Sequence, residues 1–416
     1  MNPIIDSLRI EEQWQKFLNY KIEKNHISQY EIEEIQAYIK GKRYLEMYDQ
    51  IMQGIFPKDV PEKKIVNKDG TTKKRIVYSF DHDSSITLKF IAYQLYAVDD
   101  YFADNCYAFR RKHGVAQAIR RLLQLRVQEK YCLKVDIHNY FNSICPKRLL
   151  EKLSFVPDEK LRVVFANILL NDQVMYKGEK ITEAHGAMAG ISVAPFWANV
   201  YLTEVDQMFA ERKVNYFRYS DDILILADSY EDLMDLQKIL YKKLEELGLE
   251  INHEKEAVYA PHEKLEFLGF SFSDGVVDLS THTVEKAKAR IRRKAKALMR
   301  WQRKKGLTAD KAAKGFIRSM NHKFYGTGAD DEFTWSRWFF PNITTDQSLK
   351  EIDHYMQQYI RYIITGRHYC GKSESQNPPK GKGLNAVAEK ERFDSGQSRK
   401  RIHPLNEPQI LWNRSG

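Results

Sequence analysis

Alternating apolar and polar positions mark two strands that each carry carboxylates near one end. Residues 216–227 (YFRYSDDILILA) place apolar β-forming residues on both sides of a polar centre, which predicts a short hairpin with Asp221 and Asp222 at its tip. Residues 131–137 (YCLKVDI) alternate in the same way and predict a strand with Asp136 near its end. If the two strands are neighbours, three carboxylates come together.

Three carboxylates in one place suit a divalent cation. Adjacent carboxylates repel one another, and Mg²⁺ takes hard oxygen ligands while leaving positions for substrate phosphates. We therefore interpret Asp136, Asp221 and Asp222 as ligands of two Mg²⁺ ions, with Mn²⁺ as a substitute. One ion would activate an attacking 3′-hydroxyl, and the other would stabilise a leaving pyrophosphate. For the Asp221–Asp222 pair taken alone, a solvated acidic turn is the competing interpretation.

Residues 63–80 (KKIVNKDGTTKKRIVYSF) predict a second hairpin, which has basic arms. Residues 67–70 (NKDG) supply the turn, and residues 65–66 are expected to pair with residues 76–77. A basic hairpin that is merely solvated would have the same pattern as one that contacts an anionic ligand.

Helical periodicity predicts most of the remaining elements. Residues 1–56 mix charged and apolar positions at helical spacing, which predicts an N-terminal helical extension that either covers the core or binds RNA. Pro195 is expected to open a helix, because proline is tolerated in the first helical turn. The buried face of that helix is predicted to carry Trp197, Tyr201 and Val205. Further helices are predicted over residues 86–102, 231–247, 284–305 and 349–363.

Composition limits the class of protein. The 416 residues are 43% apolar, which is enough to bury a substantial core divided among two or three subdomains. The four cysteines lack the paired spacing of a zinc or disulfide site, and neither a signal peptide nor a membrane-spanning run is evident. We therefore expect a cytoplasmic protein with no membrane partner.

The positive charge is concentrated in one segment. Residues 281–316 hold thirteen Lys or Arg and two acidic residues, whereas the whole chain has a net charge of +10. The basic helix over residues 284–305 has too few apolar residues on any one face to bind a membrane. This distribution predicts a surface that binds the phosphate backbone of nucleic acid.

The order of these features resembles that of the reverse transcriptases, specifically the bacterial branch that contains group II intron, retron and defence-associated enzymes. The resemblance covers roughly residues 57–367 and rests on Asp136, residues 190–199, residues 219–222, Lys255 and Gly269. It implies an α+β fold of the right-hand polymerase type, with fingers, a palm made of an antiparallel sheet plus helices, and a helical thumb. The implied boundaries are 1–56 for the N-terminal extension, 57–130 for the fingers, 131–275 for the palm with fingers elements near 145–195, 276–370 for the thumb and 371–416 for a polar C-terminal tail.

The resemblance also implies roles for individual residues. Around the incoming nucleotide it assigns Lys64 (or Lys63) and Arg75 to the triphosphate, the backbone of Ile137 and Gly190 to the nucleotide site, and Phe141 to a steric gate against the 2′-hydroxyl. Lys255 corresponds to the general acid that protonates the departing pyrophosphate. The primer and template contacts implied by the resemblance and the basic helix are Tyr219, Gly269, Arg292, Arg293 and Lys296.

One departure from the family pattern suggests a subgroup. Where the family usually has Pro-Gln-Gly followed by Ser-Pro, this chain has Met188-Ala189-Gly190 followed by Ala194-Pro195. The difference points to the divergent "unknown group" of bacterial reverse transcriptases, many of which serve in phage defence. We therefore expect an RNA-directed DNA polymerase that uses dNTPs, forms an RNA/DNA duplex and copies a structured non-coding RNA.

Three alternatives stay open at this point, and the sequence leaves the oligomeric state undetermined. A retron-type or intron-type retroelement enzyme would have the same catalytic residues. An RNA-dependent RNA polymerase would share the palm and its aspartates. A non-catalytic RNA-binding scaffold would keep the basic helix and tolerate loss of the aspartates.

Overall fold

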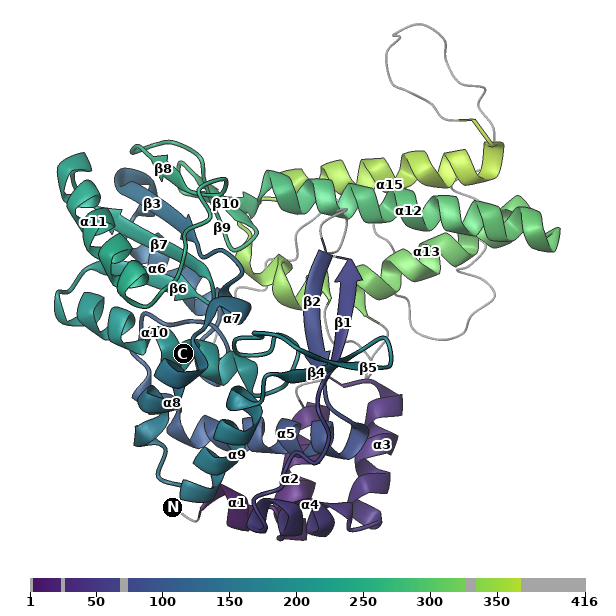
Figure 1. Cartoon of the computed structure of the whole chain (residues 1–416). Coiled ribbons are helices and arrows are strands. Elements are labelled where there is room, and N and C mark those ends of the chain that lie inside the picture. Colours follow the sequence, from purple (N-terminus) through teal and green to yellow (C-terminus); the bar gives the residue numbers. More distant parts are fainter. Residues whose placement is uncertain (1–2, 24–26, 68–73, 327–333, 368–416) are drawn as a thin grey trace, which may run out of the picture. The chain divides into compact units, whose positions relative to one another are not determined.

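A computed structural model describes residues 3–23, 27–67, 74–326 and 334–367. These residues divide into two units after Ser280, and the second unit begins with α12 (Thr281–Lys305) in Figure 1. The first unit combines helices with three sheets, so the expected mixed class of helix and sheet is confirmed. The predicted turn at residues 67–70 falls largely outside the described residues, and the predicted tail at 371–416 falls outside them entirely. The finer subdomain boundaries stay a prediction.

A central sheet with strand order β6-β7-β3-β8 organises the first unit. All of its neighbouring strands are antiparallel, as the family resemblance implied for this sheet. The strands are β3 (Tyr131–Asp136), β6 (Asn215–Tyr219), β7 (Asp222–Ala227) and β8 (Ala257–Tyr259). Helix α11 (Tyr230–Glu246) contacts β3 and β7, and α10 (Ala194–Glu211) contacts β6.

Helix α10 begins where the sequence predicts it. Pro195 lies in its first turn, and Trp197, Tyr201 and Val205 are all buried, which confirms the predicted face. Leu233, Leu240 and Leu244 of α11 are buried in the same core, as the amphipathic pattern predicts. The sheet is therefore held by helices whose apolar faces could be read from the sequence.

The predicted basic hairpin belongs to a second sheet, with order β2-β1-β4-β5. Ile65 pairs with Ile76, as predicted. Strand β1 also pairs in parallel with β4, at Glu62 and Met175, and this contact has no local signal in the sequence. The four strands are β1 (Glu62–Asn67), β2 (Lys74–Ser79), β4 (Gln173–Tyr176) and β5 (Glu179–Thr182).

The N-terminal helices are packed onto the first unit by buried aromatic contacts. Trp14 stacks on Phe90 at 4.1 Å between ring centroids, and the Tyr38 hydroxyl lies 2.8 Å from the Thr87 hydroxyl. These helices are α1 (Ile4–Ser7), α2 (Glu11–Glu23), α3 (Gln29–Lys40) and α4 (Arg43–Met52), and they lie beside α5 (His82–Gln94) in Figure 1. These contacts pack the N-terminal helices against the core of the first unit.

Short elements complete the first unit. The turn between β9 and β10 has Leu268 and Gly269 at φ values of 52° and 86°, as in a two-residue hairpin turn. The third sheet consists of β9 (Leu265–Phe267), β10 (Phe270–Ser273) and β11 (Val276–Leu279). The connecting helices are η1 (Leu95–Tyr101), α6 (Val115–Gln124), η2 (Val127–Glu129), α7 (Tyr140–Ser143), α8 (Pro146–Lys152), η3 (Leu153–Phe155) and α9 (Glu159–Leu170).

The described part of the second unit is helical. Ile291, Phe316 and Ile352 are buried where its three long helices pack together. Its elements are α12 (Thr281–Lys305), α13 (Ala309–Tyr325), α14 (Trp335–Trp338), η4 (Phe340–Asn342) and α15 (Gln347–Thr365), which confirms the helices predicted over 284–305 and 349–363. Across the described ranges of both units, no helix combines the length and the apolar character needed to cross a membrane.

Candidate active site

The pairing of two strands brings the three predicted aspartates to one end of the central sheet. Asp136, the last residue of β3, is directly opposite Asp222, the first residue of β7. Tyr219 pairs with Asp222 across the β6–β7 hairpin, so Ser220 and Asp221 form a two-residue loop. Ser220 has a φ of 61°, the left-handed conformation that such tight hairpin loops require. The Ile137 N–H donates to the Asp221 carbonyl at 3.1 Å, which fixes the loop against the end of β3.

Burial and mutual repulsion act on two of the carboxylates. Burial, followed by the nearby charges of Asp221 and Asp136, raises the pKa of Asp222 to about 6. Burial is also the main cause of a raised pKa at Asp221. A bound cation would relieve this unfavourable concentration of negative charge, so these two positions have the electrostatics of a cation site.

Asp136 is satisfied by neighbouring side chains. Lys255 Nζ lies 2.6 Å from Asp136 Oδ2, and Asn252 Nδ2 donates to Asp136 Oδ1 at 3.0 Å. The Asn252 N–H also donates to the Asp136 carbonyl at 2.8 Å, which anchors the 250–255 segment to the end of β3. The structure thus brings the predicted general acid to the predicted metal ligand, and it adds Asn252, which sequence analysis missed.

The donor chemistry of the site fits Mg²⁺ or Mn²⁺, since carboxylate oxygens are the preferred ligands of both and substrate phosphates can supply others. Within the described ranges, however, no three His, Cys, Asp or Glu side chains are grouped closely enough to hold a metal ion by themselves. The ion pair between Lys255 and Asp136 uses one of the carboxylates that the prediction assigns to the metal. Metal ligation by the three aspartates therefore stays a prediction.

Three aromatic rings lie beside the aspartate loop. The Phe109 ring centroid is 6.4 Å from that of Phe141 and 6.4 Å from that of Tyr219. Tyr140 is buried and its hydroxyl donates to the Ala198 carbonyl at 2.5 Å, so the neighbouring Phe141 is the one left half-buried. This arrangement is compatible with the predicted gate at Phe141, which no contact here tests.

A glycine-containing loop fixes the helix turn that carries Phe141. The Ala187 N–H donates to the Phe141 carbonyl at 2.7 Å. A Cβ on Gly186, which has a φ of 58°, would lie 2.4 Å from that same carbonyl oxygen. Gly190 has a comparable packing role, because a Cβ there would lie 2.8 Å from the Tyr78 carbonyl oxygen of β2. The predicted nucleotide contact of Gly190 is a separate role and stays a prediction.

The two candidate triphosphate residues lie on one face of the β1–β2 hairpin. Lys64 is opposite Val77 and Arg75 is opposite Val66, so both side chains share that face, and both are exposed. Lys63 is on the other face, where it forms an ion pair with Glu183. The geometry therefore favours Lys64 over Lys63 as the partner of Arg75.

The remaining predicted contacts are distributed over both units. The Ile137 N–H is already bonded to Asp221, so any nucleotide contact there would use another atom of this backbone. Gly269 is in the β9–β10 turn of the first unit. Arg292, Arg293 and Lys296 are exposed on α12 of the second unit, as a phosphate-binding surface requires.

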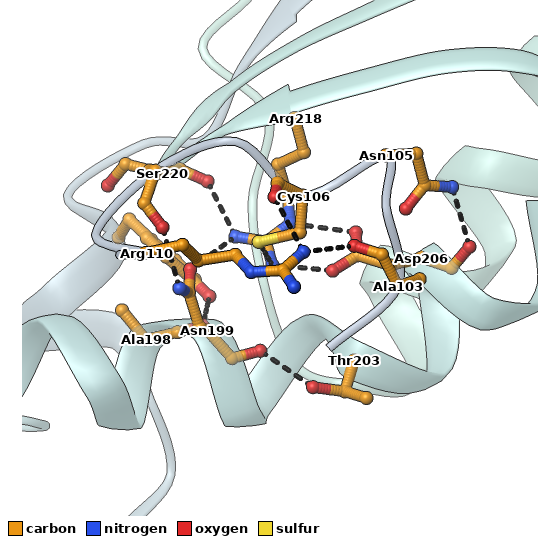
Figure 2. Close-up of polar contacts among 12 residues, drawn as sticks. Ala103, Asn105, Cys106, Arg110, Ala198, Asn199, Thr203, Asp206, Arg218 and Ser220 are labelled. Carbon is orange, nitrogen blue, oxygen red and sulfur yellow. Dashed lines mark hydrogen bonds and ion pairs between the residues drawn. The ribbon is translucent and has the colours of Figure 1, made fainter. Parts of the chain in front are cut away.

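A buried polar cluster beneath the aspartate loop was not predicted (Figure 2). Arg218 of β6 is fully buried and forms an ion pair with Asp206 of α10 at 2.5 Å. The signal was present in the sequence, since a single arginine interrupts an apolar strand and a single aspartate is on the buried face of a helix. Asn199, Cys106 and the Ser220 carbonyl also contact the guanidinium.

Comparison with known proteins identifies a family. A family model for "Reverse transcriptase (RNA-dependent DNA polymerase)" matches residues 63–272. No curated protein matches the chain. Among solved structures, apo telomerase from Candida tropicalis matches with 12% identity and a TM-score of 0.45 over 74% of this chain and 64% of that one. Telomerase from Candida albicans with a fragment of telomeric RNA matches with 12% identity and a TM-score of 0.43 over 79% of this chain and 65% of that one.

Proposed function

Because the chain belongs to the reverse transcriptase (RNA-dependent DNA polymerase) family, we propose that it copies an RNA template into DNA. The observation that carries this proposal is the pairing of Asp136 with Asp222, beside the loop that holds Asp221. Two strands distant in sequence supply the carboxylates that nucleotidyl transfer needs at one point. The right-hand arrangement of fingers, palm and thumb is part of the same proposal.

Each residue near the aspartates has a proposed task. Asp136, Asp221 and Asp222 would hold Mg²⁺, which when bound stabilises the charge that develops on the attacking and leaving oxygens. The Lys255 ammonium would leave Asp136 when substrate binds and give a proton to the departing pyrophosphate oxygen. Phe141 would exclude a 2′-hydroxyl by its bulk, which selects dNTPs. Lys64 and Arg75 would contact the triphosphate, with the planar Arg75 guanidinium suited to two phosphate oxygens.

The basic face of α12 would contact an RNA/DNA duplex. Arg292, Arg293 and Lys296 are exposed there, and side chains of this kind bind phosphates without reading sequence. Within the first unit, the proposed primer contacts are Tyr219, which pairs with Asp222, and Gly269 in the β9–β10 turn.

We further propose a dedicated template and a role in defence against phage. The support is the departure from the family pattern at residues 188–195, which resembles the divergent bacterial "unknown group". On this proposal the template is a structured non-coding RNA and the protein acts in the bacterial cytoplasm.

Sequencing the nucleic acids that co-purify with the protein tests both proposals. The comparison is between wild type and the Asp221→Ala/Asp222→Ala variant. We expect one abundant small RNA in both samples and its complementary DNA in the wild type alone. Mixed RNA without complementary DNA in either sample would contradict the dedicated template. Loss of phage protection in the variant, with RNA binding intact, would separate a defence enzyme from a retroelement.

The two non-reverse-transcriptase alternatives are distinguished by primer extension. An RNA-dependent RNA polymerase would extend a primer with rNTPs in preference to dNTPs, which the aromatic side chain at Phe141 opposes. A non-catalytic scaffold would function equally well after the Asp221→Ala/Asp222→Ala change. The half-buried, mutually repelling carboxylates at these positions oppose the scaffold, because no RNA-binding task requires their electrostatic cost.

A further inference from the structure

Arg218 is the largest charged side chain that is completely buried in the first unit. It belongs to β6, one residue before Tyr219 and two before the loop residue Ser220. Its guanidinium is 0% exposed, as is the carboxylate of Asp206 opposite it. Burying two charges is expensive unless geometry and hydrogen bonding compensate for the lost water. The pair therefore calls for an explanation beyond ordinary packing.

Every nitrogen of the guanidinium has a defined partner (Figure 2). Nε donates to Asp206 Oδ1 at 2.8 Å and Nη2 donates to Asp206 Oδ2 at 2.5 Å, which is a bidentate ion pair. Nη2 also lies 3.1 Å from Cys106 Sγ. Nη1 donates to Asn199 Oδ1 at 3.3 Å and to the Ser220 carbonyl at 3.3 Å. The bidentate pair holds the planar group in one orientation, so Nη1 is aimed at the loop.

The contact with Ser220 acts on the peptide that leads into Asp221. The Ser220 carbonyl belongs to the Ser220–Asp221 peptide, so its direction sets the direction of the Asp221 N–H and influences where the carboxylate points. Ser220 is held at a φ of 61°, a conformation that serine adopts only when its surroundings enforce it. The Asp221 carbonyl is fixed separately, by the Ile137 N–H at 3.1 Å. Arg218 thus restrains one end of Asp221 and β3 restrains the other.

The same cluster reaches the aromatic residues beside the site. Asn199 Nδ2 donates to the Ala108 carbonyl at 2.8 Å, immediately before Phe109. The Arg218 N–H donates to the Asn105 carbonyl at 2.9 Å, and the Arg218 carbonyl accepts from the Tyr107 N–H at 2.8 Å. The loop that carries Phe109 and the loop that carries Asp221 are consequently attached to one buried arginine.

We propose that Arg218 is a positioning residue that sets the geometry of the Asp221 loop, with Asp206 holding its guanidinium in register. This inference rests on the proposed function, because it concerns the same aspartates. Arg218 has no part in neutralising those aspartates, since its charge is matched by Asp206 at 2.5 Å. Its contribution is geometric, and it should appear as weaker metal binding and slower chemistry with substrate binding retained.

The test replaces the ion pair in two ways. Arg218→Met/Asp206→Leu removes both charges and keeps apolar volume, a kind of exchange that often preserves stability. Arg218→Lys keeps a charge next to Asp206, but a lysine ammonium cannot form the bidentate pair and also reach Ser220 as a planar group does. Leu161→Ala, in the buried face of α9, is the control for a general loss of stability. Urea unfolding of all variants establishes which of them fold.

Two measurements decide the outcome. In single-turnover primer extension, we expect the maximal rate of both Arg218 variants to fall about 100-fold, because displacement of a reacting group by about 1 Å can cause a loss of that size. The apparent Kd for dNTP should stay unchanged. In titrations of free Mn²⁺ followed by electron paramagnetic resonance, without substrate, we expect weaker binding than in wild type or Leu161→Ala. A folded Arg218→Met/Asp206→Leu variant with wild-type rate and Mn²⁺ affinity would overturn the proposal, as would failure of both Arg218 variants to fold.

The Mn²⁺ titration separates this inference from the proposed function. If the wild type extends no primer but binds Mn²⁺ more tightly than the Arg218 variants, the proposed polymerase function is rejected and the positioning role of Arg218 is supported. If the wild type extends primers and the Arg218 variants do so equally well, the proposed function stands and the positioning role fails. The Asp221→Ala/Asp222→Ala variant provides the baseline for both measurements.

Discussion

At the scale of single residues, the site holds three buried or half-buried carboxylates, and one of them, Asp136, forms an ion pair with Lys255. Burial and the charges of Asp221 and Asp136 raise the pKa of Asp222 from 3.8 to about 6. Because the pKa is higher in the folded state, the stabilising contribution of Asp222 is complete below pH 3.8 and is lost as the pH rises through 6. In the metal-free protein at neutral pH, a charged Asp222 therefore opposes folding.

The Asp222→Asn variant should reveal this cost. In EDTA at pH 8, we expect its free energy of unfolding to exceed that of wild type by roughly 2–3 kcal/mol, the amount that the pKa shift represents. The difference should shrink towards zero as the pH approaches 4. Urea unfolding at several pH values measures it. A stabilisation of equal size at pH 4 and pH 8 would contradict the electrostatic explanation.

At the scale of elements, the two hairpins of the second sheet are joined by one carboxylate. Glu183, one residue beyond β5, forms an ion pair with Lys63 of β1 and accepts a hydrogen bond from the Tyr78 hydroxyl of β2 at 2.6 Å. Burial favours a higher pKa for Glu183, but the bonds from Lys63 and Tyr78 outweigh it and lower the pKa. A lowered pKa means that the contribution to stability is present above pH 4.5 and is lost as the pH falls further.

The Glu183→Gln variant is expected to loosen the connection between these hairpins. We expect a loss of about 1–3 kcal/mol in the free energy of unfolding at pH 7, because Lys63 and Tyr78 lose a charged partner. Glu179→Gln, an exposed change in β5, should alter stability by less than about 0.5 kcal/mol. Equal stability of the two variants would show that the contact with Glu183 contributes nothing.

The elements that sequence analysis predicted are those set by local patterns. The helices α10, α11 and α12 each have an apolar face or a helix propensity that is visible within one segment. Strand β3 shows a clear alternation of apolar and polar residues, and β7 is a run of apolar β-forming residues. The parallel contact between Glu62 and Met175 joins segments more than a hundred residues apart, and no local periodicity specifies it. In the site, the three aspartates could be identified because they lie at the ends of two segments with a clear strand pattern. Asn252 was not, because its role depends on where the chain returns to Asp136.

At the scale of the whole molecule, charge and core are distributed unevenly along the chain. The second unit carries exposed cations along α12, whereas the first unit contains the aspartates and a core that extends into the N-terminal helices. Binding of a polyanion and burial of apolar surface can therefore be perturbed separately. Two predictions use this separation.

Neutralising α12 should change the salt dependence of duplex binding. We expect a smaller slope of the logarithm of the binding constant against the logarithm of salt concentration in the triple variant Arg292→Gln/Arg293→Gln/Lys296→Gln. The slope should fall by about 0.9 for each phosphate that the variant no longer neutralises. Fluorescence anisotropy with an RNA/DNA duplex between low and moderate salt measures the slope. The control replaces Arg212, Lys213 and Lys242, three exposed cations of the first unit, and changes net charge equally. Equal slopes for both triple variants would exclude α12 as the binding surface.

Disruption of the N-terminal core should destabilise the unit that contains the aspartates. Trp14→Ala removes a fully buried ring that stacks on Phe90, and we expect it to cost about 3–5 kcal/mol of unfolding free energy. Tyr30→Ala, at a side chain that is 71% exposed, should leave stability almost unchanged. The stabilities of the two variants are compared by unfolding experiments that use intrinsic fluorescence and circular dichroism. A Trp14→Ala protein of wild-type stability would mean that the extension is dispensable for folding.

The strand that carries Arg218 has a consequence for solution behaviour. Strand β6 is at an edge of the central sheet, and an open edge next to apolar residues is a template on which other chains can add strands and aggregate. The segment around Cys106 forms a parallel bridge to Arg218 and covers this edge near the end of β6. Loss of that segment would therefore present a fresh β-edge to neighbouring molecules. The backbone bridge at Arg218 thus occupies hydrogen-bonding groups of the edge strand that another chain could otherwise pair with.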